Sequence, residues 1–318
     1  MSAFTYRIAA DGTATRVEHA DAAADPAALS WIHLSTTAED AQSWLRDAAH
    51  LAGPVIEALT AAETRPRCEA FEEGALLNLR GRSSEELASS DPLASVRIWA
   101  THGRVISVTR KPLVVVPMVE REVEAGRILD PGDLITAFAT AITTDLDPLV
   151  ADLGDTLDDC EESLDANQIF ELRRHVTRVR KDAINYRRFI APQRQAIERL
   201  AALRGDWLDA ADRQHLAAAA DRAARMAEEL EAIRERASLT HEALTDLRAE
   251  QLDSRGLLIS AVAMVFLPLT FITGLYGMNV EGLPYAQRPW AFDAIAGLCV
   301  LIVVGVVGWF VRQRWFRG

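Results

Sequence analysis

The segment GLLISAVAMVFLPLTFITGLYGMNV, residues 256–280, sets the architecture of the chain, because its 25 successive residues carry no charged side chain. A second uncharged segment of 18 residues, AIAGLCVLIVVGVVGWFV, follows at 294–311. A helix needs about 20 mainly apolar residues to cross the hydrocarbon core of a bilayer. The two segments therefore predict two transmembrane helices. The alternative is a buried helical hairpin in a large soluble domain, although two such uncharged segments so close together are unusual in soluble cores.

The charges beside these segments predict their orientation. The connecting loop, roughly 278–289, carries one acid, Glu281, and one base, Arg288, whereas Arg312, Arg314 and Arg317 follow the second segment. Basic residues collect on the cytoplasmic side of a membrane protein. We therefore expect a bacterial inner-membrane protein with two spans, with its loop outside and both termini in the cytoplasm.

The overall composition excludes several functional classes. The chain has 318 residues and a net charge of −12, from 34 basic and 46 acidic side chains. This acidic balance argues against a nucleic-acid partner, which requires a basic surface. The three cysteines, Cys68, Cys160 and Cys299, form no closely spaced pair. We therefore expect neither a disulfide framework nor a structural zinc site built on thiolates.

The residues before the first span predict a cytoplasmic α/β domain, 1–130. Five segments resemble strands, and they begin at Phe4, Ser30, Gly74, Ala94 and Arg104. The last two of these flank Thr101-His102-Gly103, which predicts a hairpin turn. The domain contains no glycine-rich nucleotide-binding motif and no nucleophile elbow. We therefore expect no enzymatic activity.

A helical domain, 131–255, follows. Two predicted helices cover 133–164 and 168–203, and a much longer one has apolar residues every three or four positions from Leu216 to Leu247. This spacing is typical of a coiled-coil-like seam. If the long helix continues to Gly277, its roughly 70 residues span about 105 Å. The remaining expected segments are a first span at 256–280, an outer loop at 281–289, a second span at 290–311 and a tail at 312–318.

The first span ends in Gly277-Met278-Asn279. This resembles the GMN signature of the CorA superfamily of two-span metal-ion transporters. Further resemblance lies in WIHLS at Trp31, ETRPR at Glu63, SVTRKP at Ser107 and RRFIAPQR at Arg187. These segments look like the ZntB-type branch, the zinc transport proteins, so the resemblance covers nearly the whole chain.

The resemblance implies a funnel-shaped homopentamer of a mostly α-helical membrane protein. The first span of each chain would line a central pore, and the second would lie outside it. The residues lead to a similar expectation, because two helices cannot enclose a polar path and the seam of the long helix requires a neighbour. No tightly bound cofactor is implied, and Zn²⁺ is the expected cargo.

Six residues are candidates for the pore: Gly277, Met278, Asn279, Thr273, Thr270 and Leu267. A ring of Asn279 amide oxygens can hydrogen-bond the hydration shell of a divalent ion, which such ions lose reluctantly. Gly277 lets the chain leave the helix, the threonine hydroxyls can face the pore, and Leu267 matches the family's apolar constriction. Alternatively, each threonine bonds its own helix and Asn279 is a C-cap.

Glu281 is the acid nearest to the outer mouth, where five copies would concentrate cations, unless it is an ordinary solvated charge. The magnesium branch of the family has an acidic MPEL-like loop, whereas this chain has Leu283-Pro284-Tyr285-Ala286, without the acid. That departure favours zinc over magnesium.

The cytoplasmic part offers weaker candidates for metal binding. An acidic segment from Asp145 to Asp165 forms either a cation reservoir or a solvated helix face. Within it, Asp159 precedes Cys160, and His241 lies near two acids on the long helix. A lone cysteine without a suitably spaced histidine is usually structural.

Three alternatives remain. The first is a CorA-type magnesium, cobalt or nickel channel, and the second is a membrane-anchored coiled-coil scaffold. The third is an enzyme in the α/β domain. For a zinc transporter, the negative cytoplasmic potential favours uptake, and the ZntB resemblance suggests coupling to protons. Efflux, which has also been proposed for that branch, is the alternative direction.

Overall fold

The structure is a computed structural model, and it describes residues 2–17, 28–35, 38–62, 65–84, 92–163, 168–203, 207–278, 283–284 and 288–312. The chain forms two compact units. The first contains residues 1–163 and 170–241, and the second contains residues 164–169 and 242–318.

The first unit is built on one seven-stranded sheet with the order β2-β1-β3-β7-β6-β5-β4. Neighbouring strands are antiparallel except for β3 and β7, which are parallel. The strands are β1 Ser2–Ala9, β2 Ala14–Val17, β3 Ala28–Ser35, β4 Arg67–Phe71, β5 Gly74–Arg82, β6 Leu93–Thr101 and β7 Arg104–Thr109.

The five expected strands are confirmed, and the predicted hairpin joins β6 to β7. Gly103 in this turn has φ of 76°, a conformation that favours glycine. Two further strands, β2 and β4, were not predicted. Both are short edge strands whose side chains are mostly exposed, so they lack the apolar alternation that marks a half-buried strand.

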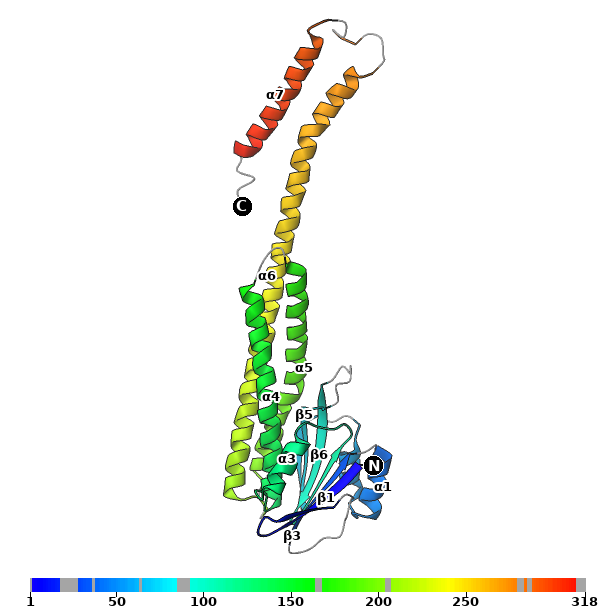
Figure 1. Ribbon diagram of the computed structural model, residues 1–318, viewed down its shortest axis with the longest axis vertical. Helices are drawn as coiled ribbons and strands as arrows, with labels where there is room; N and C mark the ends of the chain where they lie inside the picture. Colours follow the sequence, from blue (N-terminus) through cyan, green and yellow to red (C-terminus); the bar gives the residue numbers. More distant parts are fainter. Residues whose placement is uncertain are drawn as a thin grey trace. The chain divides into compact units, whose positions relative to one another are not determined.

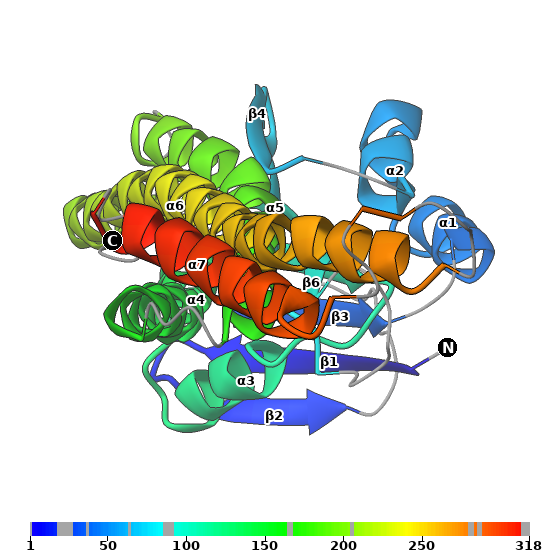
Figure 2. The ribbon, with the colours of Figure 1, turned by 90° about the horizontal axis from the view of Figure 1, so that it is seen from above.

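Helices cover both faces of the sheet. Helices α1, Ala38–Asp47, and α2, Gly53–Thr60, lie on one side, and α4, Pro131–Glu162, lies on the other (Figure 2). The first side forms an apolar core that includes Leu45, Leu59 and Trp99. On the second side the Trp31 ring of β3 meets the Phe138 ring of α4 edge to face, with centroids 5.7 Å apart.

Four helices complete this part of the chain. Helix α3, Val116–Glu124, leads into α4, and α5, Ile169–Ala201, runs beside α4 and the first part of α6, Ala210–Tyr276 (Figure 1). The expected boundary after residue 130 coincides with the start of α4. Because α4 packs on the sheet, however, the α/β and helical parts form one compact unit as far as His241.

The second unit contains the end of α6 and helix α7, Ala291–Arg312. Among the described residues, three helices are long and apolar enough to cross a membrane, namely α4, α6 and α7. The apolar window of α4 is 50% buried within the protein, whereas those of α6 and α7 are each 6% buried. Burial accounts for the apolar residues of α4, so α6 and α7 are the helices whose apolar surface still needs a bilayer or a partner.

His33 on β3 predicts a pH-dependent stability. Its Nδ1 lies 2.8 Å from Ser107 Oγ, and burial lowers the pKa of the imidazole to about 4. The unfolded chain, with a pKa near 6.5, binds more protons below that pH. We therefore expect the free energy of unfolding to fall as pH drops below 6.5, by about 2 kcal/mol at pH 5.

Thermal unfolding of the full-length protein in detergent at pH 7.5 and pH 5 tests this prediction. The variant His33→Gln should lose part of the acid sensitivity, whereas His102→Gln, in the exposed β6–β7 turn, should keep it. Equal acid sensitivity in all three proteins would contradict the assignment to His33.

Candidate functional site

The candidate pore segment, residues 267–278, closes α6. The helix ends at Tyr276, and Gly277 N donates to Thr273 O at 2.8 Å. A β-carbon on Gly277 would lie 3.0 Å from that same carbonyl oxygen, so a larger residue would crowd the helix end. Met278 is exposed, and Asn279 and Glu281 lie outside the described residues.

The two threonines of this segment bond their own helix. Thr270 Oγ1 donates to Phe266 O at 2.8 Å, and Thr273 Oγ1 donates to Leu269 O at 2.9 Å. The structure thus has the back-bonding that the sequence left open. It does not remove the threonines from the candidate site, because a hydroxyl that donates inward keeps its lone pairs as acceptors. Such an oxygen can accept from the water shell of a cation.

Leu267 and Pro268 mark a different part of the same segment. The Leu267 side chain is 76% exposed on α6. Pro268, which follows it, lies inside the helix and supplies no backbone N–H, so the helical hydrogen-bond ladder is interrupted there. An exposed leucine at a weakened point of a helix fits the expected apolar constriction.

Comparison with known proteins covers almost the entire chain. The family model described as CorA-like Mg²⁺ transporter protein matches residues 26–313. The chain belongs to this family. The sequence resemblance to the CorA superfamily is therefore confirmed.

Relatives within the CorA-like family point to its zinc transport branch. The zinc transport protein ZntB of Pectobacterium atrosepticum is 31% identical over 286 residues, which are 90% of this chain and 87% of the relative. ZntB of Yersinia enterocolitica is 28% identical, over 98% of this chain and 95% of the relative. The resemblance to the ZntB-type branch is confirmed as well.

Solved structures have the same fold along the full chain. The full-length CmaX protein matches with a TM-score of 0.78 and 31% identity, covering 98% of this chain and 97% of CmaX. The CorA magnesium transporter of Methanocaldococcus jannaschii matches with a TM-score of 0.79, covering 99% of each chain. Because the latter is only 17% identical, it supports the fold alone.

The three weaker candidates for metal binding, Cys160, Asp159 and His241, do not form a shared site in the described part of the chain. Cys160 is buried, and burial with Asp159 and Glu161 nearby raises the pKa of its thiol, which disfavours the metal-binding thiolate. The Nε2 atom of His241 lies 3.5 Å from Arg173 Nη2. None of Cys160, Asp159 and His241 belongs to a metal-sized group among the described side chains.

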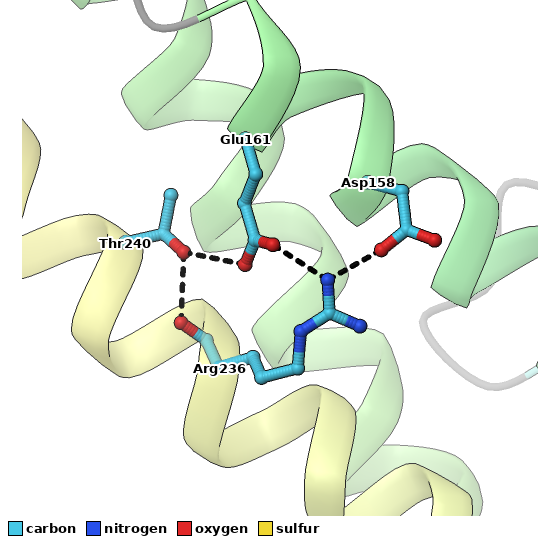
Figure 3. Close-up of polar contacts among 4 residues, drawn as sticks. All are labelled: Asp158, Glu161, Arg236 and Thr240. Carbon is cyan, nitrogen blue, oxygen red and sulfur yellow. Dashed lines mark hydrogen bonds and ion pairs between the residues drawn. The ribbon is translucent and has the colours of Figure 1, made fainter.

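Part of the acidic segment instead joins α4 to α6 (Figure 3). Arg236 Nη2 on α6 donates to Asp158 Oδ1 and, at 2.5 Å, to Glu161 Oε2 on α4. Thr240 Oγ1 also donates to Glu161 Oε1 at 2.9 Å. These carboxylates are therefore used in a structural contact, while Asp165 lies outside the described part of the chain.

Replacing Arg236 with glutamine should lower the free energy of unfolding by about 1 kcal/mol, because the contact is charge-assisted but half-exposed. Urea unfolding at low and high salt measures this loss, which should shrink with salt. The matched control is Arg194→Gln, which breaks the exposed pair with Glu198 within α5 and should cost clearly less, because solvent screens that pair. Equal losses in both variants would show that the link between helices adds nothing.

One acidic group was missed by the sequence analysis. Oxygen atoms of Asp130, Asp133 and Asp212 lie within 4.8 Å of one another. Asp130 Oδ1 accepts from Asp133 N, and Asp212 Oδ2 accepts from Asp209 N, at 2.9 and 3.0 Å. Burial raises the pKa of Asp212 to about 6. These are helix-capping contacts at the starts of α4 and α6, and capping accounts for the aspartates without a metal.

Proposed function

We propose that this protein is a transporter of divalent metal cations, with zinc as its main cargo. The observation that carries the proposal is the uncharged pore segment of α6, whose Thr270 and Thr273 oxygens remain acceptors, in a chain related end to end to zinc transport proteins. A pore segment without carboxylate, thiolate or imidazole, such as residues 267–278, binds a divalent ion weakly. Weak binding suits transport, because a site must release the ion that it binds.

We further propose a homopentamer in the bacterial inner membrane. Each chain contributes α6 and α7 as its two spans, with both termini in the cytoplasm. The low burial of the apolar windows of these two helices supports this arrangement. The apolar residues of α4 are buried within the first unit, so a third span is not needed. Five copies of α6 would line the pore, with Leu267 at its constriction and Asn279 and Glu281 at its outer mouth.

A pH gradient is the proposed driving force, with the membrane potential adding to it. Each elementary charge that moves inward gains about 2.3 kcal/mol per 100 mV. A divalent cation therefore gains twice that on entry, which favours uptake over export.

Zinc and magnesium flux into proteoliposomes tests these proposals. Purified protein is reconstituted, and ion-selective reporters inside the vesicles follow each cation with and without an outside-acid gradient. We expect zinc flux that rises with the gradient. Magnesium flux without zinc flux would instead support a CorA-type magnesium channel, the second candidate, which the matching family model favours. Absence of both fluxes would contradict the transport proposal itself.

A further inference from the structure

Arg97 is a buried charge that the pore does not explain. It lies within β6, opposite Asn78 of β5 and Val108 of β7, and its side chain is only 3% exposed. Its Nη2 atom donates to Ala61 O, just after α2, at 2.6 Å. Its Nε and Nη1 atoms have no hydrogen-bond acceptor among the described residues. A buried guanidinium with two unsatisfied donors is unfavourable, so something should compensate for it.

Two charges of the same sign act on Arg97 among the described residues. Side chains alternate along a strand, so Arg80 of β5 lies on the same face of the sheet as Arg97, and Arg110 follows just beyond the end of β7. Burial, together with these two cations, lowers the pKa of Arg97 to about 10. Arg97 therefore stays protonated at neutral pH. In the part of the chain that the structure describes, no carboxylate pairs with Arg97 or Arg110.

A further buried donor lies beside Arg80. Gln193 of α5 is 1% exposed, and its Oε1 accepts from Arg80 N at 2.8 Å. Its Nε2 atom has no acceptor among the described residues. The unsatisfied groups of Arg97 and Gln193 are thus all donors. A water molecule brings two donors and no charge, whereas sulfate supplies only acceptors and phosphate mainly acceptors, and either ion also balances the charge.

We propose that Arg97, Arg80, Arg110 and Gln193 form an oxyanion site for a small ion of the phosphate or sulfate class. Arg97 is the buried anchor, because a guanidinium can donate two parallel hydrogen bonds to one oxyanion. Arg110 is exposed and marks the side from which an ion approaches. The bound ion would join the end of α2, strands β5 and β6, and α5. It belongs to the cytoplasmic unit and not to the cation path.

Thermal unfolding of the full-length protein in detergent micelles tests this proposal. Phosphate and, separately, sulfate are titrated against sodium chloride at matched ionic strength. We expect the oxyanions to raise the melting temperature in a saturable way that chloride does not reproduce, because a ligand bound only by the folded state stabilises it. Absence of such a rise, or an equal rise with chloride, would overturn the proposal.

Two variants locate the effect. Arg97→Met should lose the saturable response. Should that variant fail to fold, Arg110→Gln carries the test, because the loss of one charge-assisted contact should raise the half-saturating phosphate concentration about tenfold. The matched control is Arg46→Gln on the exposed side of α1, which should respond as the wild type does. An unchanged response in Arg110→Gln would exclude this site as the source of the effect.

Discussion

Replacing Asn279 with alanine should lower zinc flux about tenfold or more while leaving the protein folded. In the proposed homopentamer, one substitution would remove all five amide oxygens of the proposed ring. A hydrated divalent ion would then lose several hydrogen-bond acceptors at the point where it enters. A tenfold decrease requires only about 1.4 kcal/mol of added barrier. That is equivalent to one or two neutral hydrogen bonds, so the whole ring could exceed it.

Checks on folding are needed to make this a test of transport and not of stability. Helix α6 ends at Tyr276, and Gly277 N closes its last turn by donating to Thr273 O. The last described turn of α6 is thus closed by backbone atoms of Gly277 and Thr273. Zinc flux in proteoliposomes is the measurement, with melting temperature and oligomeric size as checks on folding.

Asn279→Gln is the matched control, because it keeps the amide and lengthens the side chain by one methylene. We expect it to retain more flux than Asn279→Ala. Wild-type flux in the alanine variant would remove the amide ring from the proposed mechanism. Equal loss in both variants would indicate that shape at this position matters more than the amide.

The two long apolar helix segments were predictable because their signals are local. The absence of charge from 256 to 280 is enough to predict a spanning helix, and the structure begins α7 at Ala291, one residue from its expected start. The continuity of the longest helix could be predicted from the sequence as well. The absence of Gly and Pro from 207 to 255 predicts a helix that runs into the uncharged segment at 256–280, and α6 does so.

The sheet was only partly predictable because its pairing is not local. Nothing in 28–35 indicates that this strand lies parallel to 104–109, which follows it by about 70 residues. The edge strands β2 and β4 lack an apolar pattern because water, and not a core, covers most of their side chains. They belong to the sheet because β2 pairs with β1 and β4 pairs with β5.

The same limit applies to charged residues. Arg97 is indistinguishable in the sequence from the other 33 basic residues, because only pairing with β5 and β7 buries it. Conversely, Asp158 and Glu161 belong to an acidic segment that predicts a solvated face or a cation reservoir. In the structure both carboxylates instead accept hydrogen bonds from Arg236, which is 75 residues or more away in the chain.

Gly132 of α4 should be the position least tolerant of a single methyl group in the helical part of the first unit. A β-carbon there would lie 2.0 Å from Asp212 Oδ2 and 2.8 Å from Trp207 O. The aspartate cannot simply turn away, because its Oδ2 accepts from Asp209 N while Asp212 N donates to Asp209 Oδ1 at 2.7 Å. We expect Gly132→Ala to lower the free energy of unfolding by about 3 kcal/mol, at the upper end for overpacking.

Gly154 provides a matched control in the same helix. A β-carbon there would lie 3.8 Å from its nearest neighbours, Glu229 Oε1 and Ile233 Cδ1, which is ordinary contact. Alanine is favoured over glycine in a helix by about 1 kcal/mol. Gly154→Ala should therefore stabilise the protein, and urea unfolding of both variants should give shifts of opposite sign. A stabilising Gly132→Ala would mean that the starts of α4 and α6 do not meet as described, and that the raised pKa of Asp212 needs another cause.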